Sequence, residues 1–313
     1  MIGNIKNYLI ENNRMYRKGI ISKKKYIKIN YETFHSKLFQ YQDYLNQTEI
    51  KNIEISKNDI IFTMHEKEIK MVLPKKDIRS TPLEILNFKK YESKESNIIK
   101  LILKNKKVFI DVGANFGWYS LVLSKQFPRS KIYSFEPISN TFNYFKKNID
   151  INKCKNIIPN NIGLSNENKK ILFFYSEKHS GMTSSKNLEN LPDVRKYYLR
   201  VKTLDEYCYA NKLKPDFIKC DVEGAELLVF QGAEKTLFNN QPIVFSEILR
   251  KWSRKFNYNP NDIFKFFSNL GYRSYTAGNY KLKKFCNMND NTKETNFFFL
   301  HNIKHKKLIE TYT

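Results

Sequence analysis

The spacing of hydrophobic and polar positions divides the chain into two parts. In the first part, up to about residue 50, large apolar residues recur three or four positions apart, which indicates helices. Between residues 53 and 73, three alternating or β-branched runs are separated by short polar stretches, which predicts a small antiparallel meander. We therefore predict an extension over residues 1–95, made of helices and a β-meander. The helical positions are Ile5, Tyr8, Leu9, Phe34, Leu38, Tyr41 and Leu45.

From residue 107 onward, apolar runs of strand length alternate with amphipathic helical segments. This order is typical of a mainly parallel, doubly wound α/β sheet. We predict seven strands, with an antiparallel pair at one end, in a domain over residues 96–313. The strands are expected at 108–112, 131–136, 156–160, 216–221, 242–247, 272–276 and 295–300. Further strands are expected at 171–175 and 199–203, and helices at 93–104, 118–127, 139–149, 225–238 and 263–270.

The composition indicates a globular protein with an unusual charge. Hydrophobic residues make up 41% of the 313 residues, and Gly and Pro are sparse at 10 and 9, which excludes fibrous and low-complexity classes. A net charge of +24 suggests a polyanionic partner, or else a lysine-rich chain whose charges are simply solvated. Two basic stretches, 17–28 and 304–307, would also suit weak attachment to a membrane surface.

Cysteine use and hydropathy suggest the compartment. The four cysteines are widely separated and form no CxxC pair, so reduced thiols are expected rather than disulfides or a zinc site. The N-terminal residues lack the apolar core of a signal peptide, and no run approaches the roughly 20 apolar residues that span a bilayer. We expect a cytoplasmic protein.

The segment FIDVGANFGWYS, residues 109–120, indicates a nucleoside-cofactor site. A buried strand ends near Asp111, and Gly113 and Gly117 bracket the turn into a helix, where the backbone can approach a ligand closely. A carboxylate at Asp111 suits the cationic amino acid end of S-adenosylmethionine and would repel the pyrophosphate of a dinucleotide. Glu136 ends the next strand, where it can accept hydrogen bonds from both ribose hydroxyls.

The chain resembles the FkbM-type methyltransferases in five segments between about residues 100 and 250: VFIDVGANFGWYS (108–120), YSFEP (133–137), FIKCDVEGAE (217–226), LLVFQGAEKTLFNNQP (227–242) and SEI (246–248). The resemblance implies a Rossmann-like class I methyltransferase fold, S-adenosylmethionine, and O-methyl transfer, often to sugars of secondary metabolites or of cell-surface polysaccharides such as capsule or lipopolysaccharide. It places the methionine part of the cofactor at Asp111, Gly113, Asn115 and Gly117, the ribose at Glu136, the adenine near Asn161 and Gly163, and the transferable methyl group beside Asp221.

Transfer to a hydroxyl requires removal of a proton, so a base or a cation is expected beside the acceptor. Asp221, Glu223 and Glu247 are candidate catalytic residues because they lie at the ends of the fourth and fifth strands. Asp221 and Glu247 could instead bind Mg²⁺, which prefers oxygen ligands, and Glu223 could simply cap a helix beginning at Gly224. His179, in the loop 176–185 that could close over the acceptor, is a further candidate base. Lys219 is expected to pair with a carboxylate.

Other functions remain open from the sequence. The charge would suit a nucleic-acid methyltransferase, but the fourth strand ends in DVEG rather than in an Asn/Asp-Pro-Pro-aromatic segment that grips a flipped base. The remaining alternatives are a non-catalytic glycan-binding protein with a cofactor fold and a nicotinamide dehydrogenase. The favoured partner is a sugar, sugar-nucleotide or glycan acceptor. Residues 1–95 are expected either to cover the acceptor side or to pair subunits in a homo-oligomer.

Overall fold

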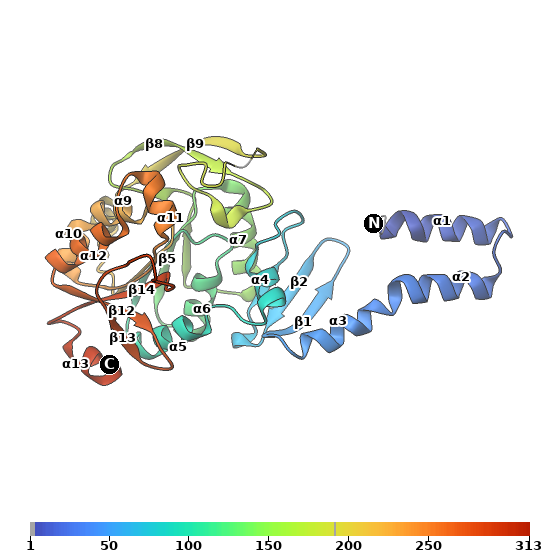
Figure 1. The fold of residues 1–313 in the computed structure, drawn as a ribbon, viewed down its shortest axis with the longest axis horizontal. Helices are drawn as coiled ribbons and strands as arrows, with labels where there is room; N and C mark the ends of the chain where they lie inside the picture. The colour runs from blue at the N-terminus through green and yellow to red at the C-terminus, as the bar shows by residue number, and fades with distance from the viewer. Residues whose placement is uncertain (1–3, 191) are drawn as a thin grey trace.

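A helical hairpin at the N-terminus extends away from the rest of the protein (Figure 1). The computed structural model describes residues 4–190 and 192–313. The predicted helical character is confirmed between residues 5 and 45. Its elements are α1 (Ile5–Arg17), α2 (Lys23–Asn30), a π-helical turn (Tyr31–His35) and α3 (Lys37–Leu45).

The predicted meander is also confirmed, as an antiparallel three-stranded sheet. Its third strand is fixed to the main body because Asn148 accepts a hydrogen bond from the Val72 amide at 2.9 Å and Asn152 accepts one from the Lys70 amide at 2.9 Å. Its apolar residues belong to the same hydrophobic cluster as one face of the central sheet. The domain boundary at residue 95 remains a prediction. The elements are β1 (Ile50–Ile55), β2 (Ile60–Met64), a 3₁₀ turn (Glu66–Glu68), β3 (Lys70–Val72) and α4 (Thr81–Phe88).

The central sheet has eight strands in the order β13-β12-β14-β11-β10-β4-β5-β6. All seven predicted strands are present. The additional strand, β13, is an edge strand with two exposed lysines, so its sequence lacks an apolar run that would have revealed it. The strands are β4 (Val108–Val112), β5 (Lys131–Phe135), β6 (Ile157–Asn160), β10 (Phe217–Cys220), β11 (Ile243–Glu247), β12 (Tyr272–Ala277), β13 (Leu282–Phe285) and β14 (Asn296–His301).

The strand directions locate the ligand crevice. Strands β4, β5, β6, β10 and β11 are parallel, whereas β14 pairs with β11 and β12 in antiparallel fashion. From β4 the chain continues outward through β5 and β6, then returns to β10 on the other side of β4. Ligands of open α/β sheets bind at such a reversal, outside the carboxyl ends of the strands. The site is therefore expected at the ends of β4 and β10.

Helices cover both faces of the sheet. Alternate residues of β4 point to opposite faces, so Phe109 belongs to one hydrophobic cluster and Ile110 to the other. One face packs against α5 (Ser93–Ile102), α6 (Trp118–Gln126) and α7 (Ser139–Asn152). The opposite face packs against α8 (Leu204–Ala210), α9 (Glu226–Gln231), α10 (Glu234–Asn240) and α12 (Pro260–Asn269). Shorter segments are α11 (Arg250–Ser253), a 3₁₀ turn (Arg254–Phe256) and α13 (Lys306–Tyr312).

The single helix predicted over 225–238 is wrong, because the structure has two helices there, α9 and α10. The break lies at Gly232, whose backbone packs against the Ser165 carbonyl: a Cβ added there would come within 2.0 Å of that oxygen. The Asp205 carboxylate accepts hydrogen bonds from the Lys235 and Thr236 amides at 3.0 and 2.7 Å, giving α10 an N-terminus of its own.

A second three-stranded sheet lies beside the crevice and contains the two flanking strands expected from the sequence. Strands β8 and β9 are antiparallel, and β7 pairs in parallel with β9. Within 4–190 and 192–313, no helix is both long enough and apolar enough to cross a bilayer. The elements are β7 (Gly163–Leu164), β8 (Lys169–Tyr175), a 3₁₀ turn (Ser180–Met182) and β9 (Arg195–Lys202).

Candidate active site

The turn after β4 requires glycine because other parts of the protein pack against it. Gly113 has φ +73°, and a Cβ on it would lie 1.8 Å from the carbonyl oxygen of Asp221 at the end of β10. Gly117 has φ +93° at the start of α6, where a Cβ would lie 2.2 Å from the ring of Phe145. The two glycines therefore let the end of β10 and the middle of α7 pack closely against the turn after β4.

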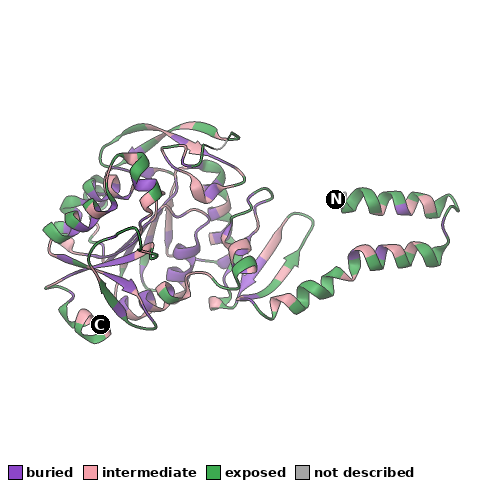
Figure 2. Cartoon of the chain, in the orientation of Figure 1, coloured by how far each residue is buried: buried purple, intermediate pink, exposed green. Residues whose placement is uncertain are grey.

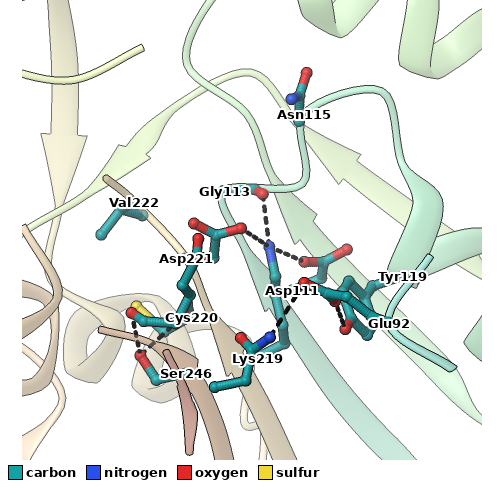
Figure 3. Close-up of polar contacts among 12 residues, drawn as sticks. Glu92, Asp111, Gly113, Asn115, Tyr119, Lys219, Cys220, Asp221, Val222 and Ser246 are labelled. Atoms are coloured by element: carbon teal, nitrogen blue, oxygen red, sulfur yellow. Dashed lines mark hydrogen bonds and ion pairs between the residues drawn. The ribbon is translucent and has the colours of Figure 1, made fainter. Parts of the chain in front are cut away.

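Lys219 forms a buried ion pair beneath this turn (Figure 3). Asp111 and Lys219 are register partners in β4 and β10, so their side chains share one face of the sheet. The Lys219 Nζ lies 3.6 Å from Asp111 Oδ1 and 3.4 Å from Asp221 Oδ2, and it donates to the Gly113 carbonyl at 2.9 Å. Burial would lower the pKa of Lys219, but the carboxylates of Asp221 and Asp111 outweigh burial and raise it. The expected pairing of Lys219 with a carboxylate is confirmed.

Asp111 itself is fully buried and faces α6 rather than open space. Its Oδ2 accepts a hydrogen bond from Ser120 Oγ at 2.5 Å. In this conformation its carboxylate neutralises Lys219 and fixes the end of β4, so direct contact with the methionine part of a cofactor stays a prediction.

Glu136, directly after β5, contacts the backbone of the glycine turn through its carboxylate. Its two carboxylate oxygens accept hydrogen bonds from the amides of Ile138 at 2.9 Å and Asn115 at 3.1 Å. Burial raises the pKa of Glu136 to about 7. Asn115 has φ +49°, and its side-chain Oδ1 is buried with no hydrogen-bond partner among the described residues. The Glu136 carboxyl group and the unpaired Asn115 Oδ1 therefore lie next to each other at the glycine turn.

The two residues expected near adenine have different surroundings. The Asn161 amide donates to the carbonyls of Glu136 and Pro137 at 2.9 and 3.1 Å, so it holds the turn after β5 instead of presenting a free amide. Gly163 lines a cavity of about 40 Å³ between the strand ends and the flanking sheet. The walls of this cavity are mostly apolar and include Val112, Phe135, Leu164, Phe173 and Val222.

Three predicted residues, Asp221, Glu223 and Glu247, meet at the ends of β10 and β11. One carboxylate oxygen from each lies within 4.8 Å of the other two. The strand ends are joined by Ser246, whose Oγ donates to the Cys220 carbonyl at 2.8 Å. Burial, followed by the charge of Asp221, raises the pKa values of Glu223 and Glu247 well above the ordinary glutamate range. The cluster is therefore suited to hold a proton or a divalent cation.

The possibility that Glu223 caps a helix at Gly224 is wrong. Helix α9 begins at Glu226, whose buried carboxylate accepts the Val222 and Gly224 amides at 3.0 Å each. Burial raises the pKa of Glu226 to about 7. Glu223 has a left-handed backbone, φ +53°, a conformation that costs energy in a residue with a side chain and tends to occur at functional sites. The sequence did not distinguish the two glutamates.

Glu92 is a further acidic residue near this cluster, and no sequence motif indicated it. It precedes α5 and accepts a hydrogen bond from the Tyr119 hydroxyl (Figure 3). It also accepts one from the Asn296 amide at 3.3 Å. Burial, together with the charge of Asp221, raises its pKa to about 7. Only the packing of distant segments brings Glu92 to the site.

The loop 176–185 lies across the strand ends, but His179 is not part of the acidic cluster. Ser184 Oγ donates to the Glu223 carbonyl at 2.9 Å, and the Ser180 amide donates to Asp77 at 3.3 Å, so the loop is tied down on both sides. His179 lines a small cavity formed by the loop and the following segment, and its Nδ1 is buried without a hydrogen-bond partner among the described residues. A role for His179 as a base stays a prediction.

A doubly wound sheet with a glycine turn at its switch point, and a carboxylate ending the next strand, is the layout of a Rossmann-like nucleoside-binding fold. Residues 111–274 match the methyltransferase FkbM domain. The chain belongs to this family of S-adenosylmethionine-dependent methyltransferases.

Similar proteins include methyltransferases from other organisms. Over 149 residues the chain is 30% identical to the hexuronic acid methyltransferase AglP of Haloferax volcanii, covering 46% of this chain and 58% of that protein. Over 143 residues it is 25% identical to methyltransferase 1 of Beauveria bassiana, covering 40% of this chain and 57% of that protein. The chain thus spans less than two thirds of either relative. A solved structure of methyltransferase FkbM from Methylobacillus flagellatus aligns with 15% identity and a TM-score of 0.39, over 62% of this chain and 43% of that one.

Proposed function

We propose that the protein transfers a methyl group from S-adenosylmethionine to a hydroxyl of a sugar, in the synthesis of a cell-surface polysaccharide. The observation that carries the proposal is the meeting of Asp221, Glu223 and Glu247 beside the glycine turn. A relative that methylates hexuronic acid supports a sugar acceptor.

The residues at the turn fit the cofactor. Glu136 can accept hydrogen bonds from a ribose diol, and the orphan Asn115 Oδ1 can accept one from an amino group. The apolar cavity lined by Val112, Phe135 and Val222 suits an adenine ring. The cavity measures about 40 Å³ and Ser185 of the loop 176–185 forms part of its wall, so we expect this wall to shift when a nucleoside binds. When bound, the cofactor supplies a methyl group activated by a sulfonium.

The chain's own residues then orient the acceptor and take its proton. An acceptor oxygen must lie roughly 3 Å from the methyl carbon and in line with the bond that breaks. A hydroxyl held there can donate a hydrogen bond to Glu247 or Glu223, and its proton moves to that carboxylate as the new bond forms. A carboxylate with a raised pKa is a better base for this step than an ordinary glutamate.

Asp221 and Glu247 also fit Mg²⁺, with Glu223 as a third oxygen ligand. A divalent cation would neutralise the mutual repulsion of these carboxylates and polarise the acceptor hydroxyl. The residues of this cluster are all acidic, so they would not pair with the phosphates of a nucleic-acid acceptor.

The test is methyl transfer from labelled cofactor to a panel of nucleotide sugars and surface glycans, with and without a chelator. We expect a labelled product that survives mild base, as a methyl ether does and a methyl ester does not. Asp221→Asn and Glu247→Gln should each lower kcat by about 10²-fold or more, whereas Glu310→Gln, a change on the exposed helix α13, should leave kcat unchanged. A base-labile product, or full activity in both site variants, would overturn the proposal. Activity unaffected by chelator would exclude the role of Mg²⁺.

A further inference from the structure

The tip of the N-terminal hairpin is a defined structural feature, distant from the active site (Figure 1). Helices α1 and α2 are joined by a short turn in which Gly19 has φ +72°. Behind the turn, the Asn12 amide donates to Asn30 at 2.8 Å, and the rings of Tyr16 and Tyr26 stack at 5.2 Å. These contacts hold the two helix ends side by side, so residues of both helices form one surface.

This tip has a dense positive charge. No Asp or Glu lies between Glu11 and Glu32, whereas seven basic residues do. Arg14 pairs with Glu11 at 3.2 Å and Lys28 with Glu32 at 3.8 Å. Along their helices, both pairs are farther from the turn than the other basic residues. The remaining basic side chains are exposed and have no carboxylate within ion-pair distance in the described part of the chain: Arg17, Lys18, Lys23, Lys24 and Lys25.

The tip also exposes apolar side chains. Ile20, in the turn itself, is 66% exposed, and Ile27, on the next helix, is 54% exposed (the exposed hairpin is visible in Figure 2). At the surface of an anionic membrane, isoleucine side chains can insert among the acyl chains while the neighbouring lysines contact the headgroups. Nucleic acid would match the lysines but offers no comparable place for an exposed isoleucine in a turn. A second copy of the hairpin would bring like charges together.

We propose that the hairpin tip binds the surface of a membrane that contains anionic phospholipids. Each Lys or Arg near such a surface contributes about fivefold to affinity. The C-terminal basic cluster, Lys304, Lys306 and Lys307, lies at the opposite end of the molecule (Figure 1), so the hairpin acts alone. A membrane-bound enzyme would meet glycans carried on lipid, but the binding itself does not depend on which acceptor is methylated.

The experiment is co-sedimentation of the full chain with vesicles of equimolar phosphatidylglycerol and phosphatidylcholine, compared with phosphatidylcholine alone. We expect binding to the anionic vesicles only, weakened by high salt. The triple change Lys23→Gln, Lys24→Gln and Lys25→Gln should lower affinity about 10²-fold. Ile20→Ser should lower it several-fold at any salt concentration. The matched control removes the same charge from the other end: Lys304→Gln, Lys306→Gln and Lys307→Gln.

Circular dichroism and thermal unfolding establish that each variant is folded, which is expected because the changed hairpin residues are exposed. The proposal is overturned by an absence of vesicle binding, by equal binding to neutral vesicles, or by an equal loss in the C-terminal control. It is also overturned if wild-type protein binds duplex DNA with the same hairpin dependence but does not bind vesicles, or if the hairpin variants change only the oligomeric state in solution.

Discussion

Replacing Lys219 by methionine should destabilise the protein strongly, because it removes the only cation paired with a fully buried carboxylate among the described residues. Asp111 is 0% exposed, and Lys219 Nζ lies 3.6 Å from it. Without the ammonium, the Asp111 carboxylate keeps a hydrogen bond from Ser120 but loses its counter-charge. Asp221 suffers less because its side chain is 32% exposed and can be hydrated.

The magnitude follows from the burial of the pair. Breaking a buried ion pair by removing one partner costs about 3–5 kcal/mol. In a chain of this length, thermal unfolding should shift by about 2 °C per kcal/mol or slightly less. Lys219→Met should therefore lower the Tm by about 5–10 °C, measured by calorimetry or circular dichroism. Lys265→Met, at an exposed position of α12, should change stability by less than about 0.5 kcal/mol.

A double variant separates the buried charge from simple loss of packing. Adding Asp111→Asn to Lys219→Met removes the unpaired charge, so the double variant should be more stable than Lys219→Met alone by about 2 kcal/mol. A loss of under 1 kcal/mol in the single variant, or strict additivity in the double variant, would show that the ion pair does not hold the ends of β4 and β10 together.

Three other changes test the site and its charges. Gly113→Ala should unfold the turn or abolish cofactor binding, because its Cβ would lie 1.8 Å from the Asp221 carbonyl; unchanged binding by calorimetry would contradict the packing described. Glu136→Gln should weaken S-adenosylmethionine about 10–100-fold, since two hydrogen bonds to a charged acceptor are weakened, and an unchanged Kd would remove Glu136 from the site. Glu226 has a folded pKa of about 7 against 4.5 when unfolded, so its contribution to stability is complete below pH 4.5 and is lost as pH rises through 7. Glu92 and Glu136 titrate in the same range, so the measure is the difference between wild type and Glu226→Gln: the variant should reduce the fall in unfolding free energy across this range by on the order of 3 kcal/mol, and an unchanged fall would contradict the assignment.

Most strands and helices could be predicted from the sequence, because buried parallel strands are short apolar runs and the helices between them carry apolar residues at helical spacing. The edge strand β13 could not be predicted because its two lysines interrupt any apolar run. The helix break at Gly232 could not be predicted because a close backbone contact leaves no periodic signal in the sequence. The proximity of Asp221 to Glu247 could be predicted because both residues end adjacent strands. The position of Glu92 could not be predicted, because only tertiary packing brings it to the site.

The side-chain direction of Asp111 follows from strand alternation, although the sequence was taken to indicate only a carboxylate beside the cofactor. Residues alternate across a strand, so Asp111 shares its face with Phe109, which packs under α6. That alternation alone points the carboxylate toward Ser120 and Lys219 and away from the opening of the crevice.

The most direct test of the account is a crystal structure of the protein with S-adenosylhomocysteine. We predict the nucleoside in the crevice after β4, with both ribose hydroxyls within hydrogen-bond distance of the Glu136 carboxylate and the sulfur facing Asp221. A crevice that stays empty at saturating ligand, or a nucleoside bound away from Glu136, would contradict the account.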